Sequence, residues 1–232
     1  MKKEFEMGMV GELTFFLGLQ VKQRKEGIFI SQEKYARNIV KKFGLDSRKH
    51  ASTPMSSSTK LNVDSSGVEV SPTLYKSIIG SLLYLTTSRP NITFSIGVCA
   101  RYQVALKESH LTAVKRIIRY INGTLDYGLW YSKDSNACLA DYSDADWAGS
   151  VDDRKSTSSG CFYLGNNLVS WMSKKQNFVS LSTAEAEYIA TGSCCTQFLW
   201  IKKLFHDNGI PRDTMCVFYD NTSAINLSKN PV

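Results

Sequence analysis

Two short apolar stretches near the start of the chain, 13–21 and 28–30, are separated by a polar turn that ends at Gly27. This pattern predicts a β-hairpin. Ser31 then precedes a stretch whose apolar positions recur at helical spacing as far as Phe43. A serine before such a stretch is a common helix cap, so we predict a helix that Ser31 begins.

Two further helices are predicted before residue 133. Pro72 begins one, because proline is favoured in the first turn of a helix, and its apolar stripe runs to Leu85. The other covers 109–122 and is followed by a glycine, a typical helix end. Between them and the first helix, residues 46–71 are rich in Ser and Thr and predict a loop or linker.

After residue 133 the pattern changes to short strands with a long helix. The predicted elements are strands at 137–144, 160–164 and 168–172, a helix at 182–207, a strand at 215–219 and a helix at 220–227. Strands followed by a helix, a strand and a helix predict an α/β domain around a mixed sheet over 137–232.

Composition narrows the class of protein. Hydrophobic residues make up 43% and charged residues 21%, which is typical of a globular chain. No apolar run reaches the roughly 18 residues of a membrane span, and the first residues lack an apolar signal core. The six cysteines have no CxxC spacing, which favours reduced thiols and disfavours zinc. We therefore expect a protein that is neither secreted nor membrane-bound.

The net charge of +7 is divided unevenly between the two halves. Residues 1–133 carry a balance of +10, and residues 134–232 carry −3. A basic half beside an acidic half suggests a polyanion-binding surface joined to a carboxylate site. Lys115, Arg116 and Arg119 crowd the polar side of one predicted helix and are our candidates for phosphate contacts. The alternative is that these cations only solvate the helix.

Three carboxylates are placed where they can meet. Asp144 ends the first predicted strand of the C-terminal half, and Asp220 follows the last. Strand ends of α/β sheets commonly hold ligands. Glu187 falls on the apolar side of the long helix, where an unpaired carboxylate is costly to bury. The three side chains could converge on one divalent cation, and Mg²⁺ prefers such oxygen ligands.

Structural explanations compete with this metal site. Asp220 precedes a predicted helix and could be its N-cap. Asp144 could belong to a turn, because Asp146 and Gly149 follow it. Glu185 stands three residues after Ser182, the spacing of a capping box, so we assign it a structural role.

The residues around these carboxylates resemble the ribonuclease H domain of copia-type retrotransposon Pol polyproteins, and the upstream residues resemble the reverse transcriptase that precedes it. The downstream matching motifs are Tyr142–Gly149 (YSDADWAG), Asp153–Thr157 (DRKST), Val169–Gln176 (VSWMSKKQ), Leu181–Ala190 (LSTAEAEYIA) and Asp220–Ala224 (DNTSA). The upstream motifs are Gly11–Leu19 (GELTFFLGL) and Tyr75–Leu85 (YKSIIGSLLYL).

The resemblance implies a division of the chain into four parts. Residues 1–45 would be the end of the reverse-transcriptase palm and the start of its thumb, followed by the linker at 46–71. Residues 72–133 would form the thumb and connection helices, giving an α+β region in all. Residues 134–232 would form an α/β, ribonuclease H-like domain.

The resemblance also implies a chemistry. Asp144, Glu187 and Asp220 match three metal-binding acids that use Mg²⁺, with Mn²⁺ as a substitute, to hydrolyse RNA in RNA–DNA hybrids. The expected partners are such a hybrid and the remainder of the Pol polyprotein. The expected location is a cytoplasmic virus-like particle or the nucleus.

Part of the family's machinery would lie outside this sequence. The family's fourth acidic residue and a histidine are expected after Val232, and the polymerase aspartates before Met1. We therefore expect an impaired nuclease, with a nucleic-acid-binding relic without catalysis as the alternative. An ATPase is disfavoured because the chain has no glycine-rich loop of P-loop spacing.

Overall fold

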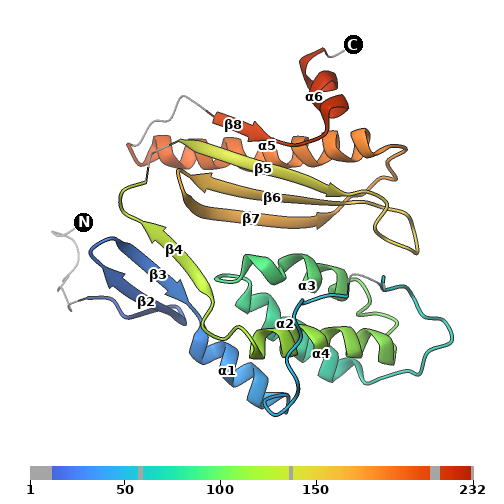
Figure 1. Ribbon diagram of the computed structural model, residues 1–232. Helices are drawn as coiled ribbons and strands as arrows, with labels where there is room; N and C mark the ends of the chain where they lie inside the picture. The colour runs from blue at the N-terminus through green and yellow to red at the C-terminus, as the bar shows by residue number, and fades with distance from the viewer. Residues whose placement is uncertain (1–11, 57–59, 136–137, 210–214, 231–232) are drawn as a thin grey trace, which may run out of the picture.

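The computed structural model describes residues 12–56, 60–135, 138–209 and 215–230 (Figure 1). Two four-stranded sheets are present in these residues, and each belongs to a different half of the chain. Buried apolar side chains form two separate clusters, one in each half. The mixed α/β fold is as predicted.

The N-terminal sheet is entirely antiparallel. Its strands, in spatial order, are β1 (Phe15–Phe16), β2 (Leu19–Arg24), β3 (Gly27–Ser31) and β4 (Gly128–Ser132). The predicted first strand is divided by a turn at Leu17 and Gly18, both of which have positive φ. The sequence did not predict β4, which returns from about a hundred residues downstream to pair with β3.

The helices of the N-terminal half lie beside this sheet (Figure 1). They are α1 (Glu33–Lys42), α2 (Pro72–Leu85), the short 3-10 helix η1 (Pro90–Ile92), α3 (Thr93–Ala100) and α4 (Glu108–Asn122). The predicted cap at Ser31 is wrong, because Ser31 is the last residue of β3 and Gln32 is the N-cap of α1. Helix α3 was not predicted, since its residues are apolar nearly throughout and show no helical periodicity.

The Ser- and Thr-rich segment 46–71 has no helix or strand in its described residues, but it is attached to the helices. Met55, Leu61 and Val70 pack against the N-terminal core. An isolated antiparallel bridge joins Glu69 to Lys107. The segment therefore forms part of the surface over α4, and it contributes walls to the hollows described below.

The C-terminal sheet is mixed, as predicted. Its strands are β5 (Leu139–Asp146), β6 (Thr157–Leu164), β7 (Asn167–Lys175) and β8 (Met215–Phe218), in the order β7-β6-β5-β8. Only the β5–β8 pair is parallel, among the strands described.

Helix α5 (Thr183–Asp207) lies along one face of this sheet, where it contacts β5 and β6 (Figure 1). Phe162 from the sheet and Phe198 from the helix meet in the buried cluster. The last helix, α6 (Thr222–Lys229), contacts α5. The edge of the sheet formed by β7 meets the N-terminal half, because β7 contacts α3 and β4. This arrangement sets the start of α5 beside the ends of β5 and β8.

Candidate carboxylate site

The parallel pairing of β5 with β8 brings Asp144 next to Asp220. The last pair in register joins Tyr142 to Phe218, and their rings stack with centroids 5.0 Å apart. Asp144 and Asp220 each follow two residues later, Asp144 still within β5 and Asp220 just past the end of β8, and the charges of both act on Glu187. Neighbouring strands are roughly 4.8 Å apart, which is close enough for both carboxylates to share a cation. Both side chains are exposed.

Glu187 reaches the same place from α5. Its side chain is 7% exposed, and Oε1 accepts a hydrogen bond of 3.2 Å from the backbone N–H of Ala145, the residue after Asp144. Burial raises the pKa of Glu187, the Ala145 N–H lowers it, and the charges of Asp144 and Asp220 raise it further. The helix thus holds one carboxylate, partly desolvated, beside the two from the sheet.

The structural explanations for the two aspartates are wrong. Asn221, not Asp220, caps α6, because its side-chain oxygen accepts a hydrogen bond of 3.0 Å from Ala224 N–H. Asp144 lies within β5, and the turn begins at Asp146, whose carbonyl accepts from Gly149 N–H. Both aspartates are therefore left without a capping or turn role.

The surroundings of the Oε2 atom of Glu187 indicate whether a cation would suit this site. This oxygen is buried and has no hydrogen-bond partner. A buried, unpartnered carboxylate oxygen is unfavourable unless a cation compensates it. Nevertheless, no three His, Cys, Asp or Glu side chains in the described part of the chain are arranged to enclose a metal ion as they stand. Binding would require the exposed side chains of Asp144 and Asp220 to turn toward Glu187.

Glu185 has the structural position assigned to it. The hydroxyl of Ser182 accepts a hydrogen bond of 3.2 Å from Glu185 N–H. The carboxylate of Glu185 accepts one of 2.7 Å from Leu181 N–H, one residue before the cap. These contacts fix the first turn of α5, and with it the direction from which Glu187 approaches the sheet.

Asp141 is a buried carboxylate that we did not predict. It lies in the middle of β5, is fully buried, and neither of its oxygens has a hydrogen-bond partner. Burial raises its pKa to about 6, against a lowering by the thiol of Cys194. The available signal was strand alternation, because Asp141 shares the side of Leu139, which faces the core.

Gln176 joins the end of β7 to the start of α5. Its Nε2 donates to the Ser158 hydroxyl at 3.1 Å and to the carbonyl of Ala186 at 2.9 Å, while its Oε1 accepts from Ser180 at 3.1 Å. All of these groups are buried or nearly so. Because Ala186 precedes Glu187, this amide holds the backbone that carries the buried carboxylate.

We expect Gln176→Ala to lower the free energy of unfolding by about 2 kcal/mol, because several buried polar groups would lose their partners. Urea unfolding measures this change. Asn177→Ala is the matched control, since Asn177 is the exposed neighbour and its loss should have little effect. Equal stability of the two variants would show that the Gln176 contacts do not hold α5.

The three basic residues of α4 do not form one exposed strip, which corrects part of our prediction. Lys115 is exposed. Arg116 instead binds the linker, with Nε 3.1 Å from the Thr53 carbonyl oxygen and a terminal nitrogen 2.9 Å from the Thr53 hydroxyl. Arg119 is partly buried and lines, with Arg116, a hollow of about 370 Å³ under the linker. The linker covers this side of the helix, which periodicity alone could not show.

Comparisons with known proteins place the chain among retroelement proteins. Residues 1–57 match the family described as reverse transcriptase (RNA-dependent DNA polymerase). The chain is 38% identical over 222 residues to a retrovirus-related Pol polyprotein from transposon RE1 of Arabidopsis thaliana, covering 95% of this chain and 15% of the relative. It is 34% identical over 240 residues to the Pol polyprotein from transposon TNT 1-94 of Nicotiana tabacum, covering 99% of this chain and 18% of that relative.

A shorter relative is matched over most of its length. An uncharacterised mitochondrial protein of Arabidopsis thaliana is 38% identical over 199 residues, which is 84% of this chain and 81% of that protein. No solved structure gives a significant match. None of the described helices combines the length and apolar character that a membrane crossing requires.

Proposed function

Because the chain belongs to the copia-type retrotransposon Pol polyproteins, we propose that its C-terminal half is a ribonuclease H domain that hydrolyses the RNA strand of RNA–DNA hybrids. One observation carries this proposal: the buried, unpartnered oxygen of Glu187 lies beside Asp144 and Asp220, which have no capping or turn role. The chain spans about 15% of the length of the RE1 and RE2 polyproteins, so the activity of the whole polyprotein is part of the proposal.

The donor set suits a hard divalent cation. Asp144, Glu187 and Asp220 offer carboxylate oxygens, the ligands that Mg²⁺ prefers, with Mn²⁺ as a substitute. When bound, such a metal stabilises developing negative charge and provides an activated water. The chain's own contribution is orientation. Ala145 N–H fixes one oxygen of Glu187, and the parallel pairing of β5 with β8 directs the two aspartates to the same edge of the sheet.

The N-terminal half is the proposed support for the duplex. It carries a balance of +10, and its first 57 residues match a reverse-transcriptase family. Positive charge of this kind binds phosphates with little sequence preference. RNA would be distinguished by its 2′-hydroxyls and by the A-like shape of the hybrid. The remainder of the Pol polyprotein is the second proposed partner.

Binding without catalysis is the second candidate function. It is favoured by the absence, among the described residues, of three side chains already arranged to enclose a metal ion. Cleavage of a hybrid with a labelled RNA strand separates the two candidates. The first predicts metal-dependent cleavage of RNA in the hybrid but not of the same RNA in single-stranded form. Binding of the hybrid with no cleavage in Mg²⁺ or Mn²⁺ would leave the second.

Lys115 gives a prediction about binding that does not depend on cleavage. Because its side chain is exposed on α4, we expect Lys115→Glu to remove about one phosphate contact, flattening the log–log salt dependence of hybrid affinity by roughly 0.9 on the scale for B-form duplexes. The control is Lys203→Glu, an equal charge change on the exposed side of α5. If both variants keep the original slope, Lys115 only solvates its helix.

A further inference from the structure

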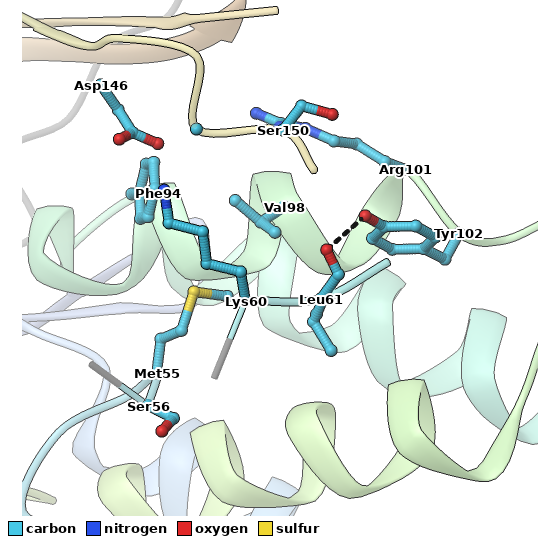
Figure 2. A pocket seen from close by; sticks show the side chains of 11 residues that line it. Met55, Ser56, Lys60, Leu61, Phe94, Val98, Arg101, Tyr102, Asp146 and Ser150 are labelled. Atoms are coloured by element: carbon cyan, nitrogen blue, oxygen red, sulfur yellow. Dashed lines mark hydrogen bonds between the residues drawn. The ribbon is translucent and has the colours of Figure 1, made fainter. Parts of the chain in front are cut away.

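A cavity of about 160 Å³ lies where the N-terminal helices meet the turn after β5 (Figure 2). Its wall is formed by residues 55, 56, 60 and 61 of the linker, by one side of α3 and the two residues that follow it, and by residues 146, 149 and 150. The volume is several times the roughly 30 Å³ share of one water molecule in the liquid. The cavity can therefore admit a group as large as a phosphate.

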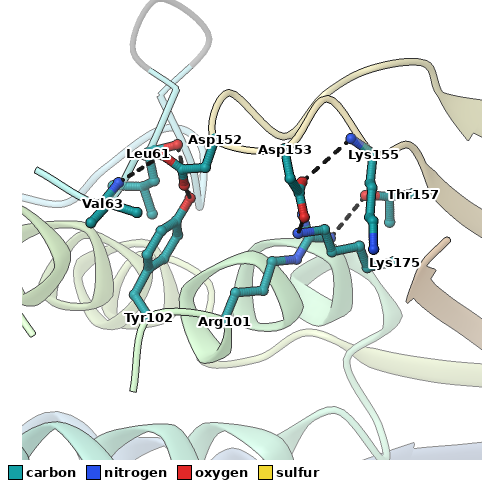
Figure 3. Close-up of polar contacts among 9 residues, drawn as sticks. All are labelled: Leu61, Val63, Arg101, Tyr102, Asp152, Asp153, Lys155, Thr157 and Lys175. Atoms are coloured by element: carbon teal, nitrogen blue, oxygen red, sulfur yellow. Dashed lines mark hydrogen bonds and ion pairs between the residues drawn. The ribbon is translucent and has the colours of Figure 1, made fainter. Parts of the chain in front are cut away.

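Polar contacts beside the cavity hold its two walls together (Figure 3). The hydroxyl of Tyr102 lies 3.0 Å from the carbonyl oxygen of Leu61 and 3.0 Å from Oδ2 of Asp152. The other oxygen of Asp152 accepts from Val63 N–H at 3.0 Å. The turn after β5 is thus fastened to both α3 and the linker, which gives the cavity a defined wall.

Two cationic side chains line this cavity without an ion pair. Arg101 is partly buried, and its guanidinium donates to the Thr157 hydroxyl at 2.8 Å. Burial lowers its pKa, against smaller opposing effects that include the charges of Asp146 and Asp153. Within the described residues, neither Arg101 nor Lys60 has a carboxylate at ion-pair distance. A desolvated guanidinium with spare donors is a favourable partner for a phosphate.

The charges of the wall suit an anion with one negative charge. Asp146 also lines the cavity and opposes anion binding. The two cations outnumber this carboxylate, which leaves a balance of +1. A backbone phosphodiester carries a single negative charge, so its binding would neutralise the cavity.

The cavity also has a fixed relation to the carboxylate site. Asp146 follows Asp144 by two residues in β5, so the two side chains leave the strand on the same side. Two residues of a strand span about 6.6 Å. This is comparable to the distance between successive phosphates of one nucleic-acid strand, so a strand at Asp144 would bring its next phosphate toward the cavity.

We propose that Lys60 and Arg101 bind one backbone phosphodiester of the RNA strand in this cavity, next to the linkage that lies at Asp144, Glu187 and Asp220. This assignment rests on the proposed ribonuclease function and makes the junction between the two halves of the chain a positioning site. It explains why the turn after β5 is attached to α3. The same junction then joins the duplex support to the carboxylates.

The test uses hybrids in which one phosphate of the RNA strand at a time is replaced by an uncharged methylphosphonate. Affinity for the full chain is measured with metal chelated, so that the RNA remains intact. We expect one position, or two adjacent ones, to weaken binding about tenfold. We call this loss of affinity at one phosphate the position effect. It should be mostly absent in Lys60→Gln and in the double variant Lys60→Gln/Arg101→Gln. Lys60→Gln is the safer variant, because Lys60 is exposed and its loss should not affect folding.

Lys203→Gln is the matched control. It removes the same charge 16 residues along α5 from Glu187, which is about 24 Å, and should leave the position effect intact. Equal position effects in the wild type and in Lys60→Gln would overturn the assignment. So would competition by inorganic phosphate, at constant ionic strength, without any position effect, since that result indicates a site for free anions. The binding assay does not require cleavage. A position effect without any cleavage of the hybrid would therefore contradict the proposed nuclease activity and leave the proposed phosphate site intact.

Discussion

Glu187→Gln is expected to reduce metal-dependent cleavage of the RNA–DNA hybrid at least about 100-fold, since even outer partners of metal ligands are commonly worth 10- to 100-fold. The substitution keeps the size of the side chain and can keep the contact with Ala145 N–H. It removes the one buried negative charge of the proposed metal site. Stability should be unchanged or higher, because burial raises the pKa of Glu187 and an amide carries no charge to desolvate.

The matched control for this experiment is Glu185→Gln. Glu185 lies two residues earlier in α5 and contacts Leu181 N–H at the start of the helix. Its substitution should alter stability by a few tenths of a kcal/mol to about 1 kcal/mol and leave cleavage largely intact. Cleavage rates are measured at several Mg²⁺ concentrations. Similar losses in the two variants would mean that Glu187 acts only through the fold.

Asp141 is expected to make the protein less stable as the pH rises. Its pKa is about 6 in the folded chain against 3.8 for the ordinary group. Well below pH 3.8 the group is protonated in both states, and its ionisation costs nothing. Between the two values the unfolded chain releases the proton and the folded chain retains it, so stability falls as pH rises. Above pH 6 the full cost of roughly 3 kcal/mol is present.

We therefore expect Asp141→Asn to lack most of this loss, about 2.4 kcal/mol, between pH 4 and pH 7. Urea unfolding at a series of pH values measures the difference from wild type. Asp134→Asn is the control, because Asp134 is exposed shortly before the same strand and should leave the pH profile unchanged. A wild-type profile in Asp141→Asn would show that the carboxylate reaches solvent or a partner in the folded protein.

The elements of the C-terminal half could be predicted because they depend on local patterns. The change to short apolar stretches predicted strands that correspond to β5, β6 and β7, and the capping spacing at Ser182 marked the start of α5. The burial of Glu187 followed from its place on the apolar side of that helix. The approach of Asp144 to Asp220 depends on the parallel pairing of β5 with β8. The sequence predicted both strands in a mixed sheet but did not show which strands are neighbours.

Features that depend on distant parts of the chain could not be predicted. Strand β4 is defined by its pairing with β3. Arg116 is hydrogen-bonded to Thr53 because the linker folds over α4. Helix α3 has no polar side to reveal it, since it packs between the other N-terminal helices and β7 of the C-terminal sheet. The isolation of Asp141 likewise depends on α5 covering the centre of the sheet.

A crystal of the chain soaked in Mn²⁺ tests the metal site most directly, because Mn²⁺ scatters anomalously and substitutes for Mg²⁺. We predict an anomalous peak between Asp144, Glu187 and Asp220, at about 2.0–2.2 Å from a Glu187 oxygen, close to Mg²⁺–oxygen distances. The peak should be absent from crystals of Glu187→Gln. A chain that binds Mn²⁺ only elsewhere, or leaves the Glu187 oxygens without a metal at saturating concentration, would contradict this prediction.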